Sequence, residues 1–317
     1  MAVSRARAGW RPTAAAAATL SIGAVLAQPL TEFRPVRQAW EMLREGTYWR
    51  LHLNPDLVPS DAVAVMLEAG LSGNLFNFYG WGGFLLYTLH PQCRVFVDGR
   101  AVLFGPQVIE DFGKINNRRP TAPELLDRYR VDMTVMPEEW FPPEARPGTW
   151  VPLFRNTSSA VYGRAGSENV SRAAAYYEGL GIPFDPDGGF VEGTALEKNP
   201  AWARSRHLLP QDLLDVVDPL YEVLRSGRWK ISGSQVPFRT RIAEAFMKAG
   251  DTASAVVELR EAHRLDPNDH FVLINLANLE ISRGRLNAAR KVLTDHLSRH
   301  PDDAQARALL LQVERNR

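Results

Sequence analysis

The last eighty residues repeat themselves every 34 positions, and this period constrains the fold more than any other feature of the chain. The residues that recur at this spacing are Gly250 and Gly284, Ala255 and Ala289, Leu259 and Leu293, and Pro267 and Pro301. A fixed period of this length is typical of helix-turn-helix units that stack into a solenoid. The glycines are placed to end each first helix, the alanines to let paired helices approach closely, and the prolines to separate the units.

This stretch resembles the tetratricopeptide repeat (TPR) family. The first unit covers 236–269 and the second 270–303, and residues 304–317 are expected to form a capping helix. The matching residues are Ala243, Phe246, Gly250, Ala255, Ala262 and the LDPND run at 265–269 in the first unit, and Asn275, Leu276, Asn278, Gly284, Ala289, Leu293 and Pro301 in the second. Glu280 replaces the usual aromatic residue and His296 the usual alanine, which predicts looser packing in the second unit.

The resemblance implies a surface that binds a protein or peptide partner. In this family the first helix of each unit lines the concave face, where lysine and asparagine side chains can hold a peptide backbone or carboxylate. The residues placed there are Glu244, Met247, Lys248, Ile274, Asn275, Asn278 and Ser282. The alternative is that two units form only a shallow groove and serve to cap and brace the preceding domain.

Residues 60–166 alternate between strand-like and helix-like segments, which predicts an α/β domain with a small mixed sheet, flanking helices and a closing hairpin. Helices are expected at 60–70, 82–89, 107–115 and 122–129, strands at 74–79, 94–98 and 131–136, and the hairpin at 151–155 and 160–164. The segment 167–235 is less regular, so we interpret it as a linker followed by a helical lead-in to the repeats.

Two glycine-bearing motifs in this domain are candidates for a ligand site: NFYGWGGFLLY at 77–87 and CRVFVDGR at 93–100. If their strands are parallel, Trp81, Asp98 and Arg100 follow strand ends at one edge of the sheet, where open α/β sheets commonly bind ligands. The indole could stack on a sugar while the ion pair binds hydroxyls. The alternative is a local turn, in which Asp98 caps backbone N–H groups and pairs with Arg100.

With these motifs and its closing WxPLFxNxxxxVYxR hairpin, the segment 56–164 resembles the soluble tail of bacterial multi-spanning membrane proteins related to the GT-C glycosyltransferases. The resemblance implies an alternative function, as the soluble carboxy-terminal part of a membrane glycosyltransferase that contacts the acceptor. The spanning helices that would hold a lipid-linked sugar donor are absent from the sequence. We therefore expect no catalysis by this chain alone and assign no catalytic residue.

The amino terminus predicts export or membrane anchoring. Arg5, Arg7 and Arg11 precede an uncharged, alanine-rich run from 14 to 27. At 1.5 Å per residue this run spans about 21 Å, short of the roughly 30 Å hydrocarbon core, which favours a signal sequence over a free-standing membrane helix. Extension through residue 30 gives a marginal anchor instead, and residues 31–59 are expected to form a stalk. Either interpretation places the body outside the cytoplasm, anchored in the periplasm or secreted, whereas an alanine-rich soluble helix or disordered leader would not.

Composition and motifs exclude several other functions. The 37 basic and 36 acidic residues give a net charge of +1, which disfavours nucleic acid as a partner. A single cysteine, Cys93, excludes an intrachain disulfide and a cysteine-based zinc site, and the seven histidines show no metal-ligand spacing. We predict no metal. GxGxxG and P-loop motifs are absent, so we predict no cofactor. Cys93 is expected to be a free buried thiol.

Overall fold

The computed structural model describes residues 58–144, 146 and 148–315. The predicted signal or anchor segment, 1–30, lies outside the described residues, as does nearly all of the predicted stalk, 31–59. Within the described part of the chain, no helix is both long enough and apolar enough to cross a membrane.

A five-stranded mixed sheet forms in the first half of the described chain, as the alternating segments predict. Its strands are β1 (Gly73–Asn77), β2 (Cys93–Val95), β3 (Met133–Pro137), β4 (Trp150–Arg155) and β5 (Ser159–Arg164). They lie in the order β2-β1-β3-β5-β4. β1 pairs in parallel with β2 and β3, whereas β5 pairs antiparallel with β3 and with its hairpin partner β4. The mixed sheet and the closing hairpin are confirmed.

Helices cover both faces of the sheet because successive strand residues, which point to opposite faces, are apolar on both. Leu75 and Val161 pack on one face with α3, α4 and α7, and Phe76 and Tyr162 pack on the other with α5 and α6. The elements around the sheet are α3 (Ser60–Glu68), η2 (Tyr79–Trp81), α4 (Gly82–Leu89), η3 (Ala101–Leu103), α5 (Gly105–Asn116), α6 (Ala122–Arg128) and α7 (Glu168–Gly179).

Residues 167–235 are largely helical and belong to the core. The predicted helical lead-in is present as the helix over residues 211–225, whereas the part expected to be a linker also packs into the core. After α7 they form α8 (Glu192–Lys198), α9 (Pro200–Ser205), α10 (Gln211–Arg225) and η4 (Arg228–Ser232). Tyr177 and Tyr221 are fully buried in the same apolar cluster as Leu75 of the sheet and Phe246 of the first repeat. α8 and α9 have only 7 and 6 residues, too few for a helical period to be recognised in the sequence. The core therefore continues from the sheet into the repeats.

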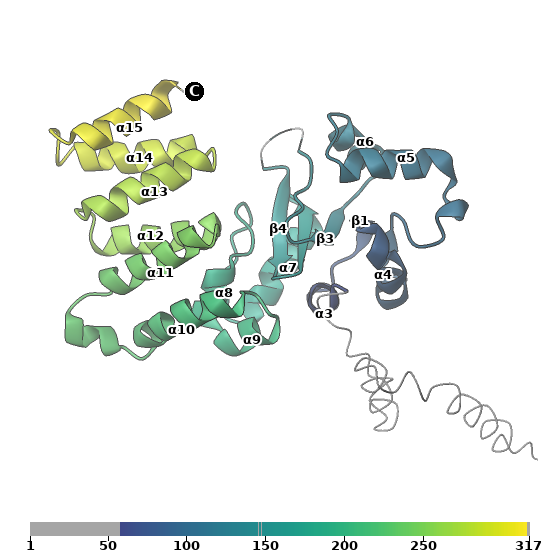
Figure 1. Cartoon of the computed structure of the whole chain (residues 1–317), viewed down its shortest axis with the longest axis horizontal. Coiled ribbons are helices and arrows are strands. Elements are labelled where there is room, and N and C mark those ends of the chain that lie inside the picture. The colour runs from purple at the N-terminus through teal and green to yellow at the C-terminus, as the bar shows by residue number, and fades with distance from the viewer. Residues whose placement is uncertain (1–57, 145, 147, 316–317) are drawn as a thin grey trace, which may run out of the picture. The chain divides into compact units, whose positions relative to one another are not determined.

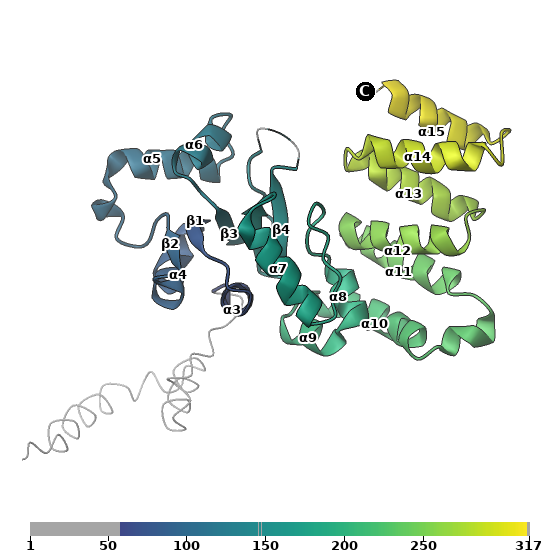
Figure 2. The same ribbon diagram turned by 180° about the vertical axis from the view of Figure 1, so that it is seen from behind.

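The predicted repeats are confirmed as paired helices. They are α11 (Val236–Lys248), α12 (Thr252–Leu265), α13 (His270–Ser282) and α14 (Leu286–Leu297), followed by α15 (Ala304–Arg315). Figure 1 and Figure 2 show these five helices stacked in chain order. Gly250 and Gly284 have φ values of 80° and 70°, the left-handed conformation that ends a helix at little cost for glycine. Ala255 and Ala289 are fully buried, which allows the close helix approach that the period predicts.

The two departures from the repeat pattern in the second unit are buried polar side chains, each with one partnered atom, while Glu280 Oε2 and His296 Nδ1 are buried without a hydrogen-bond partner among the described residues. Glu280 is 1% exposed and accepts hydrogen bonds from Arg260 of α12. His296 is 3% exposed, and its Nε2 lies 2.8 Å from Asp303 Oδ2. Polar pairs between successive helices thus replace the apolar contacts that the family's usual residues would make.

Candidate functional site

The Trp81 indole lies in the core of the sheet domain. Trp81 ends η2, is 8% exposed, and packs edge-on against Phe78 with ring centroids 5.2 Å apart. An indole that stacks on a sugar must present an open face, and burial leaves little of this ring for such a contact. The WGG motif therefore places Trp81 in the core, whereas a ligand contact would require an exposed side chain at this position.

Asp98 and Arg100 form the local turn that was the alternative interpretation. The carboxylate of Asp98 is 2% exposed and accepts hydrogen bonds from the Arg100 backbone N–H at 2.8 Å and from its Nε at 3.0 Å. Its other oxygen lies 2.6 Å from Arg100 Nη2. The hydrogen bonds from Arg100 lower the pKa of Asp98. The acid is thus occupied by its neighbour, although β1 and β2 are parallel as the site required.

The seven side chains expected on the concave face of the repeats divide by exposure. Lys248, Asn278 and Ser282 are exposed, and Glu244 is half-buried. The other three are held by the protein itself: Ile274 is 8% exposed, Met247 packs on the main core, and Asn275 donates a hydrogen bond to the Phe271 carbonyl 2.9 Å away. The exposed three lie on α11 and α13. Of these, Ser282 donates its hydroxyl to the Leu279 carbonyl 2.9 Å away and can offer a partner its oxygen as an acceptor.

The structure brings together three acids and an arginine that the sequence did not connect. Arg155, at the end of β4, donates a hydrogen bond to Glu192 of α8, and its Nη2 lies 3.5 Å from Asp251 Oδ1. Its Nη1 lies 3.9 Å from Glu138 Oε1. These side chains line a cavity of about 240 Å³. Asp251 also caps α12, because its carboxylate accepts the Ser254 N–H. The cluster therefore joins the hairpin, α8 and the first repeat.

Glu192 is the titratable group of this cluster with a pKa in the neutral range. Burial and, after it, the Asp251 carboxylate raise the pKa of Glu192, whereas Arg155 lowers it, and the net result is a pKa of about 7. A strongly perturbed carboxyl in a cavity is a recognised indicator of a functional site, but structural ion-pair networks perturb pKa values too. Because Arg155 contacts acids from three separate elements, we interpret the cluster as a clamp between them.

The clamp predicts a pH dependence of stability. The folded pKa of Glu192, about 7, lies above its ordinary value of 4.5. Between these values the folded state holds a proton that the unfolded state has released, so stability falls as the pH rises through this range. The substitution E192Q mimics the protonated form and should remove this fall. We expect the variant to exceed the wild type at pH 8 by on the order of 2 kcal/mol and to equal it near pH 4.5.

Urea denaturation of both proteins at the two pH values measures this difference. E178Q, which changes an exposed glutamate of α7, is the matched control and should follow the wild type. A stability difference between E192Q and the wild type that is the same at both pH values would exclude Glu192 as the group that titrates.

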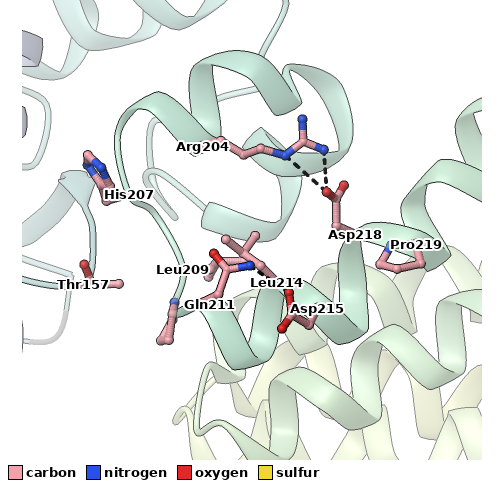
Figure 3. A pocket seen from close by; sticks show the side chains of 10 residues that line it. Thr157, Arg204, His207, Leu209, Gln211, Leu214, Asp215, Asp218 and Pro219 are labelled. Carbon is pink, nitrogen blue, oxygen red and sulfur yellow. Dashed lines mark hydrogen bonds and ion pairs between the residues drawn. The ribbon is translucent and has the colours of Figure 1, made fainter.

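A second cavity, of about 670 Å³, lies beside the start of α10. Figure 3 shows Arg204 directed at Asp218 across it, and the Arg204 Nε lies 3.2 Å from Asp218 Oδ2. His207 Nδ1 lies 2.9 Å from Asp61 Oδ2. Burial would raise the pKa of Asp218, but hydrogen bonds from Arg204 and Arg225 lower it on balance. The charged side chains of this cavity already have hydrogen-bond or ion-pair partners within the protein. Few of their charges are therefore available to bind a ligand.

Comparison with known proteins supports the prediction of tetratricopeptide repeats. Residues 246–313 match the family model described as tetratricopeptide repeat. A stretch of 109 residues is 33% identical to cellulose synthase operon protein C of Xanthomonas axonopodis pv. citri (strain 306). This match covers 32% of the present chain and 7% of the relative, so the chain spans only a small part of the relative's length. The resemblance of residues 56–164 to GT-C-related proteins stays a prediction. The stretch of paired helices over residues 246–313 is thus similar to tetratricopeptide repeats.

Proposed function

We propose that this chain is an interaction module of the cell envelope, which binds a protein or peptide partner through its tetratricopeptide repeats. The match of residues 246–313 to that family supports the proposal most directly. Repeats of this family form extended surfaces suited to binding, because each unit buries its apolar residues against its neighbours and exposes polar side chains to solvent. Lys248, Asn278 and Ser282 are such exposed side chains on α11 and α13.

The location in the envelope is part of the same proposal. It rests on the order of basic residues and an uncharged alanine-rich run within residues 1–30, which is typical of export or anchoring. The Xanthomonas relative is named for a cellulose synthase operon, which makes proteins encoded beside this chain the first candidates for its partner. The glycosyltransferase alternative has no comparable support, because Trp81 is buried and Arg100 occupies Asp98.

The proposal predicts that exposed residues on the first helices of the repeats determine partner recovery. In a pull-down from detergent-solubilised membranes, with the full chain as bait, the variant K248A/N278A/S282A should recover about tenfold less partner than the wild type. K291A is the matched control, because Lys291 is an exposed lysine on α14, a second helix of a repeat. Quantitative mass spectrometry measures the recovery. Unchanged recovery with the triple variant would remove α11 and α13 from the binding surface.

A further inference from the structure

A third cavity, of about 610 Å³, is rich in arginine and shares no lining residue with the other two cavities. It is bounded by the loop 183–191, by α8, by one face of α12, and by the turn between α13 and α14. We call it the arginine pocket and define it by Phe184, Val257, Arg260, Arg264, Arg283 and Arg285.

The arginines of this pocket differ in whether they have a counter-charge. Arg260 pairs with Glu280, and Arg264 pairs with Glu261 at 2.7 Å. Arg283 and Arg285, on either side of Gly284, have neither an ion pair nor a side-chain hydrogen bond among the described residues, although both are half-buried. Two neighbouring guanidinium groups thus line the cavity without an ion-pair partner in the described part of the chain, although the carboxylates of Asp185, Glu197 and Glu261 also line it.

The surroundings of Arg283 disfavour its charge. Burial lowers the pKa of Arg283, and the charge of Arg285 lowers it further, against the opposing effect of Glu280. A partly buried cation that lacks a partner has lost hydration without gaining an ion pair. An anion bound between Arg283 and Arg285 would supply the missing charge and accept hydrogen bonds from both.

The loop 183–191 lines the cavity beside Arg285 and contributes an apolar side chain to it. A β-carbon at Gly188 would lie 2.5 Å from Asp185 Oδ2 and 3.5 Å from Arg285 Nη2, so the missing side chain keeps the loop close to that guanidinium. Phe184 is stacked on Tyr177 of α7, with centroids 5.5 Å apart and planes 9° apart. This stacking fixes the aromatic wall of the pocket. Val257 of α12 is half-buried and also lines the pocket.

We propose that the arginine pocket binds a peptide segment of the partner protein in which carboxylate groups stand beside an apolar side chain. The carboxylates pair with Arg283 and Arg285, and the apolar side chain contacts Phe184 and Val257. This inference rests on the proposed function, since it names the chemistry of the peptide that the repeats bind. It differs in place from the concave face, because the pocket is lined by a second helix, α12, and by a turn.

The combination of lining groups favours a peptide over other anions. Inorganic phosphate carries charge but has no apolar part to cover Phe184 and Val257. An acidic glycan could stack the C–H face of a sugar ring on Phe184, but it has no aliphatic side chain to contact Val257. A cavity of about 610 Å³ also exceeds what a single small anion fills, and it falls within the range of pockets that enclose several side chains or a drug-sized ligand. A bidentate guanidinium is suited to the planar carboxylate group.

Fluorescence anisotropy with the full chain tests the proposal. The probe is a labelled eight-residue peptide that contains two leucines followed by two glutamates, and the matched probe has glutamine in place of glutamate. We expect the glutamate peptide to bind and the variant R283Q/R285Q to weaken its binding by at least about tenfold. R241Q, which changes an exposed arginine of α11 outside the pocket, should bind like the wild type. Thermal unfolding of R283Q/R285Q should match the wild type, since neither arginine has a partner to lose.

Each outcome decides the inference. A tenfold loss with R283Q/R285Q, together with weak binding of the glutamine peptide, supports it. Equal binding of the glutamate peptide to wild type and R283Q/R285Q, or no binding to either, overturns it. Thermal stabilisation of the wild type, but not of R283Q/R285Q, by millimolar inorganic phosphate or by an oligogalacturonate, with no binding of the peptide, also overturns it and identifies a small-anion or glycan site instead. If the inference fails in any of these ways while K248A/N278A/S282A still loses the partner, the interaction function stands and only this pocket is excluded.

Discussion

Replacement of Arg239 by methionine is expected to lower the free energy of unfolding by about 3–5 kcal/mol at pH 8. Arg239 of α11 is 7% exposed and binds two acids: its Nη1 lies 2.8 Å from Glu258 Oε2, and its Nη2 lies 2.9 Å from Glu197 Oε1. Tyr221 of α10, fully buried, donates a hydrogen bond to the second oxygen of Glu258 at 2.8 Å. Methionine preserves much of the apolar volume but leaves Glu258 buried without its cation.

The loss should depend on pH because Glu258 can take up a proton. Burial raises the pKa of Glu258 to about 7, and removal of the Arg239 charge raises this pKa further. At pH 5.5 the variant therefore holds Glu258 neutral and should lose less stability than at pH 8. Urea denaturation of the wild type and R239M at both pH values measures this. Equal losses would show that packing, not the unpaired charge, accounts for the effect.

Two further variants separate the charge from the packing. R239M/E258Q removes the buried acid while the amide keeps the Tyr221 hydrogen bond, so it should recover at least half of the stability that R239M loses. Glu197 then retains Lys198, whose Nζ lies 3.6 Å away. R264M breaks an exposed pair within α12 and should leave the free energy of unfolding unchanged within error. Failure of the double variant to recover would exclude the buried charge as the cause.

The repeats could be predicted from the sequence because their period is a property of packing. Ala255, Ala289, Leu259 and Leu293 are fully buried at their 34-residue spacing, and a contact that recurs in every unit leaves the same residue type at the same place. The strands could be predicted for a similar reason, since each is a short apolar run bounded by polar or glycine residues. Both predictions depend on patterns within one continuous stretch of sequence, namely the 34-residue period of the repeats and the short apolar runs of the strands.

The candidate sites could not be predicted in the same way, because contacts distant in sequence form them. The arginine pocket joins residues near 184, 260 and 284. One local signal was present: Ala249 and Asp251 flank Gly250 in the first repeat, whereas Arg283 and Arg285 flank the equivalent Gly284. The change from Asp251 to Arg285 beside an unchanged glycine marks this turn as a place where the two units differ in charge. The surface that this turn faces is formed in part by the loop 183–191. The sequence of that loop has no regular pattern from which its position could be predicted.

The WGG and DGR motifs are candidates for a ligand site with a local turn as the alternative, and the contacts in the structure favour a structural role. A β-carbon at Gly82 would lie 2.1 Å from the Val97 carbonyl oxygen and 2.6 Å from Asp98 Cα. Asn77, at the end of β1, fixes the same loop: its Nδ2 donates to the Val97 carbonyl at 2.9 Å, and its Oδ1 accepts the Phe96 N–H at 2.9 Å. The unusual residues thus allow the start of α4 to lie against the chain that leaves β2.

The substitution G82A is therefore expected to lower the free energy of unfolding by at least about 3 kcal/mol, since the added methyl group meets backbone that Asn77 holds in place. G83A is the matched control in the next position of α4. Gly83 is exposed and has no neighbour within 4 Å of a built β-carbon, so alanine should leave stability unchanged or raise it by up to about 1 kcal/mol through its better helix propensity. Thermal and urea denaturation of the two variants measure the contrast. If G82A proved as stable as G83A, close packing could not be the reason for the WGG motif, and a contact with a ligand would again be the better explanation of its glycines.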